Sequence, residues 1–327
     1  MSTWRRRVNY IFIFINRAPP YVNDSQWDNI LPFLERGFRE GTIAVAPRGV
    51  NNEWNLHFRD ETYPAMARLI ENFILYANVN PNKVYLVGFS AGGDGAYQMA
   101  ERIPHLLAGI SPQGGHPNGV STINQCNLPM YLAVGEKDAA YKRNKVMGEH
   151  YNNIIGNRQK YGGPYLAKCE VVSNSPHSFQ CWIKPRKGYF NNDKNIVVTN
   201  DTAFDFLYAN QRIPYPTEIN LDTNIFRTPL RNHFSKRGNF FYFIEIGDKS
   251  TELIRLKINY QNCSIQVFEG NNFRIWINSK VFGNEIIAVN GNKIRLNKNN
   301  NLAKENMKLF CDPYYAFDSF IDVGSFN

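Results

Sequence analysis

Two hydrophobic periodicities divide the chain. Up to about residue 212, short apolar runs of the kind that form buried strands alternate with stretches whose apolar residues recur every three or four positions. The strands expected from these runs are 10–15, 42–46, 84–88, 107–111, 129–134 and 167–172. Strands that alternate with helices predict an α/β domain, in which a mostly parallel sheet is flanked by helices on both faces.

Two of the helical stretches have clear apolar stripes. One follows a capping serine, Ser25, and the other spans residues 63–77. Their apolar residues are Trp27, Ile30, Leu31, Leu34 and Phe38 in the first stretch, and Met66, Leu69, Ile70, Phe73 and Ile74 in the second. We interpret both stripes as faces that pack on the sheet.

The pattern changes after Arg212. Pro214 and Pro216 interrupt the chain, and short alternating runs follow at 240–246, 253–260, 264–268, 273–277 and 285–289. An Asn290-Gly291 pair joins the last run to 293–296 and predicts a tight hairpin. The sequence therefore predicts an α/β domain over 1–212, a linker over 213–231 and a small antiparallel β domain over 232–327.

Composition narrows the classes of function. The 327 residues are 43% hydrophobic and 14% aromatic, which is enough for packed cores in a large and a small domain. The net charge of +9 comes from interrupted basic clusters in different elements, so no stripe suited to nucleic acid is expected. The sequence does not specify an oligomeric state.

The five cysteines are scattered and form no Cys-x-x-Cys pair. Neither a zinc site nor a disulfide framework is predicted, no cofactor is expected, and reduced thiols favour a cytoplasmic setting. The apolar run at 10–15 is short and rich in β-formers, so we interpret it as a strand rather than a signal peptide. No segment is long enough for a membrane span.

The chemistry is expected at Gly88-Phe89-Ser90-Ala91-Gly92, where an apolar strand breaks into a helical pattern. This is the layout of a nucleophile elbow, in which a serine sits on a sharp turn between strand and helix. The glycines on either side of Ser90 leave room for that turn because they have no Cβ. Ser90 is therefore the predicted nucleophile.

A serine nucleophile needs a base and an acid that orients it, and in this class of fold they follow in the order Ser, Asp, His. Asp138 comes directly after the strand expected at 129–134, and His177 follows the strand expected at 167–172. Both therefore emerge at the same sheet edge as Ser90. Each residue also has a structural interpretation: Asp138 fits the role of a helix N-cap, and His177 could be a loop histidine with no functional role.

The oxyanion hole is expected to use the backbone amide of Ala91 and a second amide from the loop after the first strand. That loop reads Asn-Arg-Ala-Pro-Pro, and because prolines have no amide hydrogen, Arg17 or Ala18 is the expected second donor. Four residues on loops at the expected carboxyl ends of strands are candidates for lining the substrate pocket, with packing under the loops as the alternative: Trp54, His57, His116 and Trp182.

These motifs resemble α/β-hydrolases of the carboxylesterase, dienelactone hydrolase and polyhydroxybutyrate depolymerase kind, over residues 8–212. The likeness also includes Val45-Ala46-Pro47-Arg48-Gly49, Gly115-His116-Pro117-Asn118 and Asp138-Ala139-Ala140-Tyr141 with Arg143-Asn144. The resemblance implies a Ser90, Asp138, His177 triad. It departs at the start, where fuller members have two more strands, so we expect a reduced sheet or an edge covered by the second domain.

The expected function is metal-independent hydrolysis of a small-molecule or polymeric carboxylic ester through an acyl-enzyme intermediate. A peptidase or amidase with the same triad remains open, because ester and amide hydrolysis pass through similar tetrahedral intermediates. A non-catalytic binding protein of the same fold also remains open. The motifs do not specify the acyl group, the leaving group or the purpose of the β domain.

Overall fold

The computed structural model describes residues 10–16, 38–49, 57, 59–178, 186–190, 197–199, 202–227, 240–283, 285–296, 315 and 317–324. The chain divides into two compact units. One comprises Met1–Lys160 and Tyr165–Arg212, and the other comprises Tyr161–Pro164 and Ile213–Asn327. Within the described ranges, no helix is both long and apolar enough to cross a membrane.

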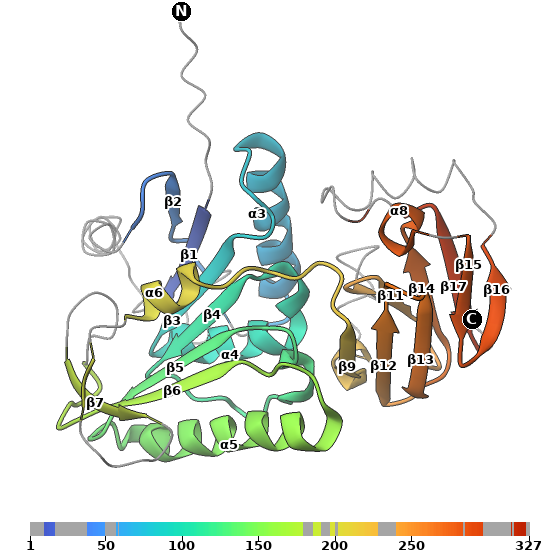
Figure 1. Ribbon diagram of the computed structural model, residues 1–327. Coiled ribbons are helices and arrows are strands. Elements are labelled where there is room, and N and C mark those ends of the chain that lie inside the picture. The colour runs from blue at the N-terminus through green and yellow to red at the C-terminus, as the bar shows by residue number, and fades with distance from the viewer. Residues whose placement is uncertain are drawn as a thin grey trace, which may run out of the picture. The chain divides into compact units, whose positions relative to one another are not determined.

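The first unit is built on one sheet, which has eight strands in the described part of the chain (Figure 1). Their order is β2-β1-β3-β4-β5-β6-β7-β8. The strands are β1 (Tyr10–Asn16), β2 (Thr42–Val45), β3 (Val84–Phe89), β4 (Gly109–Gln113), β5 (Met130–Gly135), β6 (Ala167–Val172), β7 (Arg186–Phe190) and β8 (Val197–Thr199). The first six pair in parallel, whereas β7 and β8 are antiparallel additions at one edge. The predicted mostly parallel sheet is confirmed.

The order of the strands creates a switch point beside β3. The chain passes from β1 outward to β2 and then returns to pair β3 with the other side of β1. In open parallel sheets, binding crevices form outside the carboxyl ends of strands at such a point. The loop after β3 therefore begins where this class of fold places its ligands.

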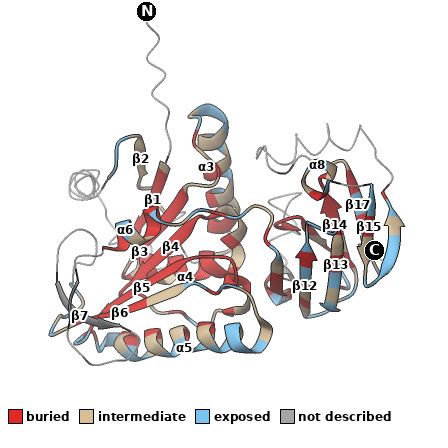
Figure 2. Cartoon of the chain, in the orientation of Figure 1, coloured by how far each residue is buried: buried red, intermediate tan, exposed pale blue. Residues whose placement is uncertain are grey.

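Alternate side chains of each central strand pack on opposite faces of the sheet. On one face, Ile11 and Ile13 of β1 share a core with α3 (Thr62–Tyr76), α4 (Ala91–Arg102) and α5 (Arg143–Tyr161). On the other face, Phe12 and Phe14 pack with Phe204 and Leu207 of α6 (Ala203–Tyr208). Figure 2 shows the central strands β3, β4 and β5 almost wholly buried. Burial on both faces explains why these strands read as continuous apolar runs.

The second unit consists of two sheets that share one core. In the residues described for this unit, one sheet has the order β10-β11-β14-β17 and the other β16-β15-β13-β12-β9. The strands are β9 (Glu218–Asp222), β10 (Phe240–Phe241), β11 (Ile244–Ile246), β12 (Leu253–Asn259), β13 (Ser264–Glu269), β14 (Phe273–Ile277), β15 (Ile286–Val289), β16 (Asn292–Arg295) and β17 (Ser319–Val323), with a short helix α8 (Ser279–Phe282). The predicted small β domain is confirmed in class, although β13 and β15 pair in parallel.

Two details of this unit differ from the sequence-based expectation. Residues 218–222, expected in a linker, form β9, which pairs with β12. The run 240–246 is not one strand but the hairpin of β10 and β11, with a positive φ of 55° at Tyr242. The hairpin at Asn290 and Gly291 forms as predicted, with both residues at positive φ. The helix expected after Ser25 lies outside the described residues.

Candidate active site

Ser90 stands on the sharp turn between β3 and α4 in a backbone conformation that few residues adopt. Its φ and ψ are 58° and −124°, and its backbone N–H donates to the Gln113 carbonyl of β4 at 2.9 Å. A Cβ on Gly88 would lie 2.1 Å from the Gly92 carbonyl oxygen, so a side chain at position 88 would push this turn open. Such strained conformations persist where the surrounding structure fixes them, and they concentrate at functional sites.

His177 contacts both of the other residues that the sequence predicts as a triad. Its Nε2 lies 2.9 Å from Ser90 Oγ, and its Nδ1 lies 2.6 Å from Asp138 Oδ2. The residues come from three loops that follow β3, β5 and β6. The structure therefore brings together residues that lie 39 and 87 positions from the histidine along the chain.

The loops that carry Asp138 and His177 are packed directly on each other. A Cβ on Gly135, the last residue of β5, would lie 2.3 Å from the Pro176 carbonyl oxygen. The Glu136 carboxylate accepts a hydrogen bond from the Asn174 backbone N–H at 2.8 Å, and the Lys137 N–H donates to the Ser175 carbonyl at 2.9 Å. These contacts fix the distance between the acid and the histidine.

The three side chains differ in exposure. Asp138 is fully buried, Ser90 is 4% exposed, and the side chain of His177 is 33% exposed. The imidazole of His177 stacks on the ring of Phe89, with the ring centres 5.1 Å apart. A buried acid, a stacked imidazole and a nearly buried hydroxyl give the histidine a fixed orientation and leave one edge toward solvent.

Arg143 was not predicted as a site residue. It begins α5, and its Nη1 lies 3.8 Å from Asp138 Oδ1, the oxygen that His177 does not contact. The Arg143 side chain is 10% exposed, and its guanidinium lies over the Tyr141 ring at 4.7 Å. The sequence signal is weak: a basic residue five positions after an acid has no special spacing, and only its place in the family-like motif marks it.

Asp94, in the first turn of α4, fixes a further loop at this end of the sheet. Its Oδ1 accepts the His116 backbone N–H at 2.6 Å. Burial raises the pKa of the Asp94 carboxyl, and the hydrogen bond from His116 and the charge of Arg143 oppose that shift. Asp94 therefore positions the Gly115-His116 loop beside the elbow.

The remaining predicted site residues fall into two groups. Ala91 is the first residue of α4, where a backbone N–H has no partner within the helix. His116 is half-buried, and its Nδ1 accepts the Asn118 N–H at 2.9 Å. His57 is 2% exposed and packs against Gly95 of α4, and burial lowers its pKa to about 4. The oxyanion candidates Arg17 and Ala18 and the pocket candidates Trp54 and Trp182 lie outside the described residues.

Part of the chain matches a known protein family. Residues 46–195 match the dienelactone hydrolase family, and that range contains Ser90, Asp138 and His177. The chain contains an α/β-hydrolase domain. No curated protein matches the chain. The family match supports a hydrolytic enzyme of esterase type for the α/β-hydrolase domain.

Three solved structures resemble parts of this chain. The esterase PE8 is 16% identical, with a TM-score of 0.42 over 53% of this chain and 86% of that chain. LpqC, a poly(3-hydroxybutyrate) depolymerase from Bordetella parapertussis, is 16% identical, with a TM-score of 0.41 over 53% and 76%. A carboxylesterase from Mesorhizobium loti is 13% identical, with a TM-score of 0.35 over 52% and 82%. Because these scores are low, the fold of the α/β-hydrolase domain is assigned from its strand order and the family match.

The site has the groups for nucleophilic chemistry. A serine hydroxyl within 3 Å of an imidazole can lose its proton as it attacks, since that distance allows direct proton transfer. Among the described residues, no group of three or more His, Cys, Asp or Glu side chains is placed to hold a metal ion.

Proposed function

We propose that this protein hydrolyses a carboxylic ester through a Ser90, His177, Asp138 triad and an acyl-enzyme intermediate. One observation carries the proposal: the imidazole of His177 lies within hydrogen-bonding distance of Ser90 Oγ on one side and of Asp138 Oδ2 on the other. A hydroxyl, an imidazole and a carboxylate in contact in this order support the assignment of nucleophile, base and orienting acid.

In the first half of the reaction, Ser90 Oγ forms a bond to the carbonyl carbon of the ester while its proton passes to His177 Nε2. Asp138, hydrogen-bonded to Nδ1, holds the imidazole in the tautomer that can accept this proton and stabilises the imidazolium. His177 then gives the proton to the departing alkoxide, so that an alcohol leaves and an ester of Ser90 remains.

In the second half, a water molecule attacks the acyl group of Ser90. His177 takes a proton from that water and returns it to Ser90 Oγ as the carbon–serine bond breaks, which releases the carboxylic acid and regenerates the hydroxyl. Water is consumed once, and no redox step is involved.

The developing oxyanion needs hydrogen-bond donors. We assign one to the backbone amide of Ala91, because α4 begins there and its first amides point out of the helix end. We assign the other to the loop after β1, at Arg17 or Ala18. Substrates of this site are small-molecule or polymeric esters.

Labelling with a fluorophosphonate probe tests the proposal directly, because such probes bond covalently to activated serines. The parent chain is expected to be labelled at Ser90 and to hydrolyse p-nitrophenyl acetate, whereas Ser90→Ala should lose both. Ser264→Ala, which removes a serine hydroxyl from a half-buried position in the second unit, is the matched control and should retain both. Hydrolysis by Ser90→Ala at the parent rate would refute the proposal.

A further inference from the structure

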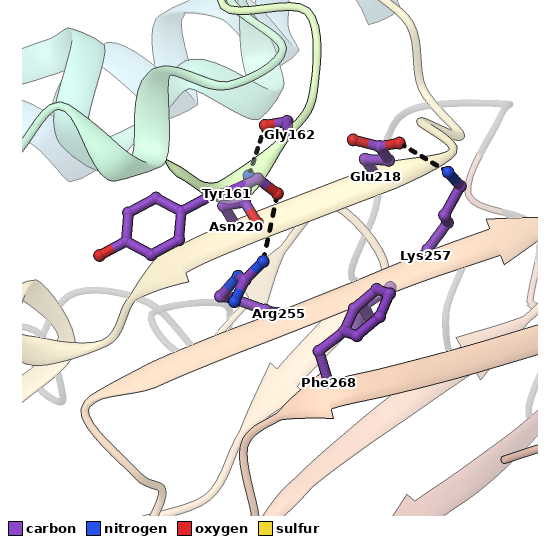
Figure 3. Close-up of a pocket in the computed structure, with 8 residues that line it drawn as sticks. Tyr161, Gly162, Glu218, Asn220, Arg255, Lys257 and Phe268 are labelled. Carbon is purple, nitrogen blue, oxygen red and sulfur yellow. Dashed lines mark hydrogen bonds and ion pairs between the residues drawn. The ribbon is translucent and has the colours of Figure 1, made fainter. Parts of the chain in front are cut away.

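A cavity of about 170 Å³ lies on the outer face of the five-stranded sheet in the second unit (Figure 3). Its walls are side chains of β9, β12 and β13 together with Tyr161 and Gly162, which belong to the same unit. Pockets for drug-sized ligands measure about 300–1,000 Å³, so this cavity suits one small ring with its substituents.

The cavity is centred on a guanidinium group held between two aromatic rings. The Arg255 Cζ atom lies 4.8 Å from the ring centre of Tyr161 and 5.7 Å from that of Phe268. The Arg255 Nη2 atom also donates a hydrogen bond to the Tyr161 carbonyl at 3.2 Å. These contacts keep the guanidinium in one orientation, so a ligand that binds to it would not have to order a free side chain.

The charge of Arg255 is less well compensated than that of its neighbour Lys257. Lys257 Nζ lies 3.2 Å from Glu218 Oε1, a direct ion pair visible in Figure 3. The carboxylate paired with Arg255 is that of Glu269, with a separation of 4.0 Å, and its side chain is 51% exposed and screened by solvent. The Arg255 Nε atom is buried and has no hydrogen-bond partner within the described part of the chain.

The residues that line the cavity therefore carry one positive charge in excess, since they include two cations, Arg255 and Lys257, and one carboxylate, that of Glu218, while Glu269 lies outside the lining. A ligand with a single negative charge would complement that excess. A dianionic phosphate would not, because the Glu218 carboxylate also borders the cavity.

Phe268 adds a flat apolar wall. Its side chain is 54% exposed, so that part of the ring is open to a ligand that arrives from solvent. An exposed aromatic ring beside a fixed guanidinium presents a stacking surface and a carboxylate-binding group within one small cavity.

We propose that this cavity binds a monocarboxylate built on a single six-membered ring, with the carboxylate on the Arg255 guanidinium and the ring against Phe268. Two sources share this chemistry, an acidic sugar and an aromatic acid. The site lies in the second unit and does not depend on the activity proposed for Ser90.

Saturation-transfer NMR on the full chain distinguishes the sources. The probes are D-galacturonate and benzoate, each paired with an uncharged counterpart, methyl galactoside and benzyl alcohol. At least one carboxylate is expected to bind more tightly than its uncharged counterpart, and the one that binds identifies the source. Binding of neither carboxylate, or equal binding of charged and uncharged rings, would overturn the proposal.

Variants locate the binding. Arg255→Gln is expected to weaken binding of the carboxylate ligand roughly tenfold or more, because a charge-assisted hydrogen bond is lost. Arg274→Gln is the matched control, because Arg274 also lies over an aromatic ring, that of Phe320 at 4.1 Å, but on the other sheet. Binding that survives Arg255→Gln, or falls equally in both variants, would place the ligand elsewhere.

Phe268→Ala keeps the test decisive if Arg255→Gln fails to fold. Phe268 is exposed, so its truncation should leave the melting temperature nearly unchanged. Phe268→Ala should nevertheless weaken binding of the ring, whereas the control Arg274→Gln should bind it as the parent chain does. Undiminished binding by Phe268→Ala would exclude the stacking wall.

Discussion

The Arg143 guanidinium lies 3.8 Å from the Asp138 carboxylate oxygen that His177 does not contact, and both side chains are buried. Asp138 is therefore held from two sides, by an imidazole on Oδ2 and by a cation near Oδ1. Without the cation, the carboxylate would stay buried with a single partner.

We expect Arg143→Met to be destabilising because it leaves the Asp138 charge buried without its cation. Breaking a buried pair costs about 3–5 kcal/mol, and the lower end applies here because the separation is long. Chemical denaturation measures the loss of stability, and fluorophosphonate labelling measures the effect on the reactivity of Ser90. Arg143→Lys keeps the charge and should recover part of the stability and part of the labelling. If Arg143→Lys behaves like Arg143→Met, charge is not what Arg143 supplies.

The proposed triad should behave as one unit. Ser90→Ala is expected to lower kcat by about 10⁶-fold and Asp138→Asn by about 10⁴-fold, because the amide holds the wrong tautomer of His177. The double variant Ser90→Ala, Asp138→Asn should be no slower than Ser90→Ala alone. Steady-state kinetics on the three variants checks this, and multiplicative losses would argue against cooperation between the two residues.

Two glycine-to-alanine substitutions, one beside the proposed active site and one at an exposed position in a helix, should affect kcat differently. Gly135→Ala should lower kcat, because the new Cβ would collide with the Pro176 carbonyl oxygen and displace the loop of His177. Gly156 lies in α5, where a new Cβ would meet no atom of another element within 4 Å, so Gly156→Ala should leave kcat unchanged. It should also raise the free energy of unfolding by about 0.5–1 kcal/mol, because alanine favours helix. Equal kcat values for both variants would show that the loop tolerates the displacement.

Two buried histidines should make stability depend on pH. Burial lowers the pKa of His57 to about 4 and that of His150 to about 3, from an ordinary value of 6.5. Between pH 6.5 and these lowered pKa values, the unfolded chain binds protons at the two histidines and the folded chain does not. Their contribution to stability is therefore full above pH 6.5 and is lost on acidification, down to about pH 4 for His57 and about pH 3 for His150. The expected slope is on the order of 1 kcal/mol per pH unit for each histidine.

Chemical denaturation across this range measures that slope. The comparison that isolates the histidines is the double variant His57→Gln, His150→Gln, whose stability should vary less steeply with pH than that of the parent chain. An equally steep profile in the double variant would assign the acid sensitivity to carboxylates instead.

Much of the first unit could be predicted from the sequence because its strands are buried on both faces. The strand expected at 167–172 has those bounds in the structure, and the run at 84–88 extends by one residue to Phe89. The proximity of Ser90, Asp138 and His177 could also be predicted from the sequence, because the carboxyl ends of parallel strands meet at one edge.

The features that were missed depend on contacts between distant segments. β17 at Ser319–Val323 pairs with β14 across more than forty residues of sequence, and β9 lies where prolines suggested a linker. Arg143 acquires its importance from its distance to Asp138, which no local pattern encodes. The run 240–246 reads as one strand because Tyr242 is a residue that rarely takes a positive φ.

The assignment of Tyr161–Pro164 to the second unit has a consequence for dissecting the protein. The carbonyls of Tyr161 and Gly162 accept hydrogen bonds from Arg255 and Asn220, although the chain then returns to the first unit. A fragment that stops at residue 212 would keep these carbonyls and lose their donors. Cutting the polypeptide once therefore does not release two self-contained halves, and the shortened fragment should be less stable than its share of the intact chain.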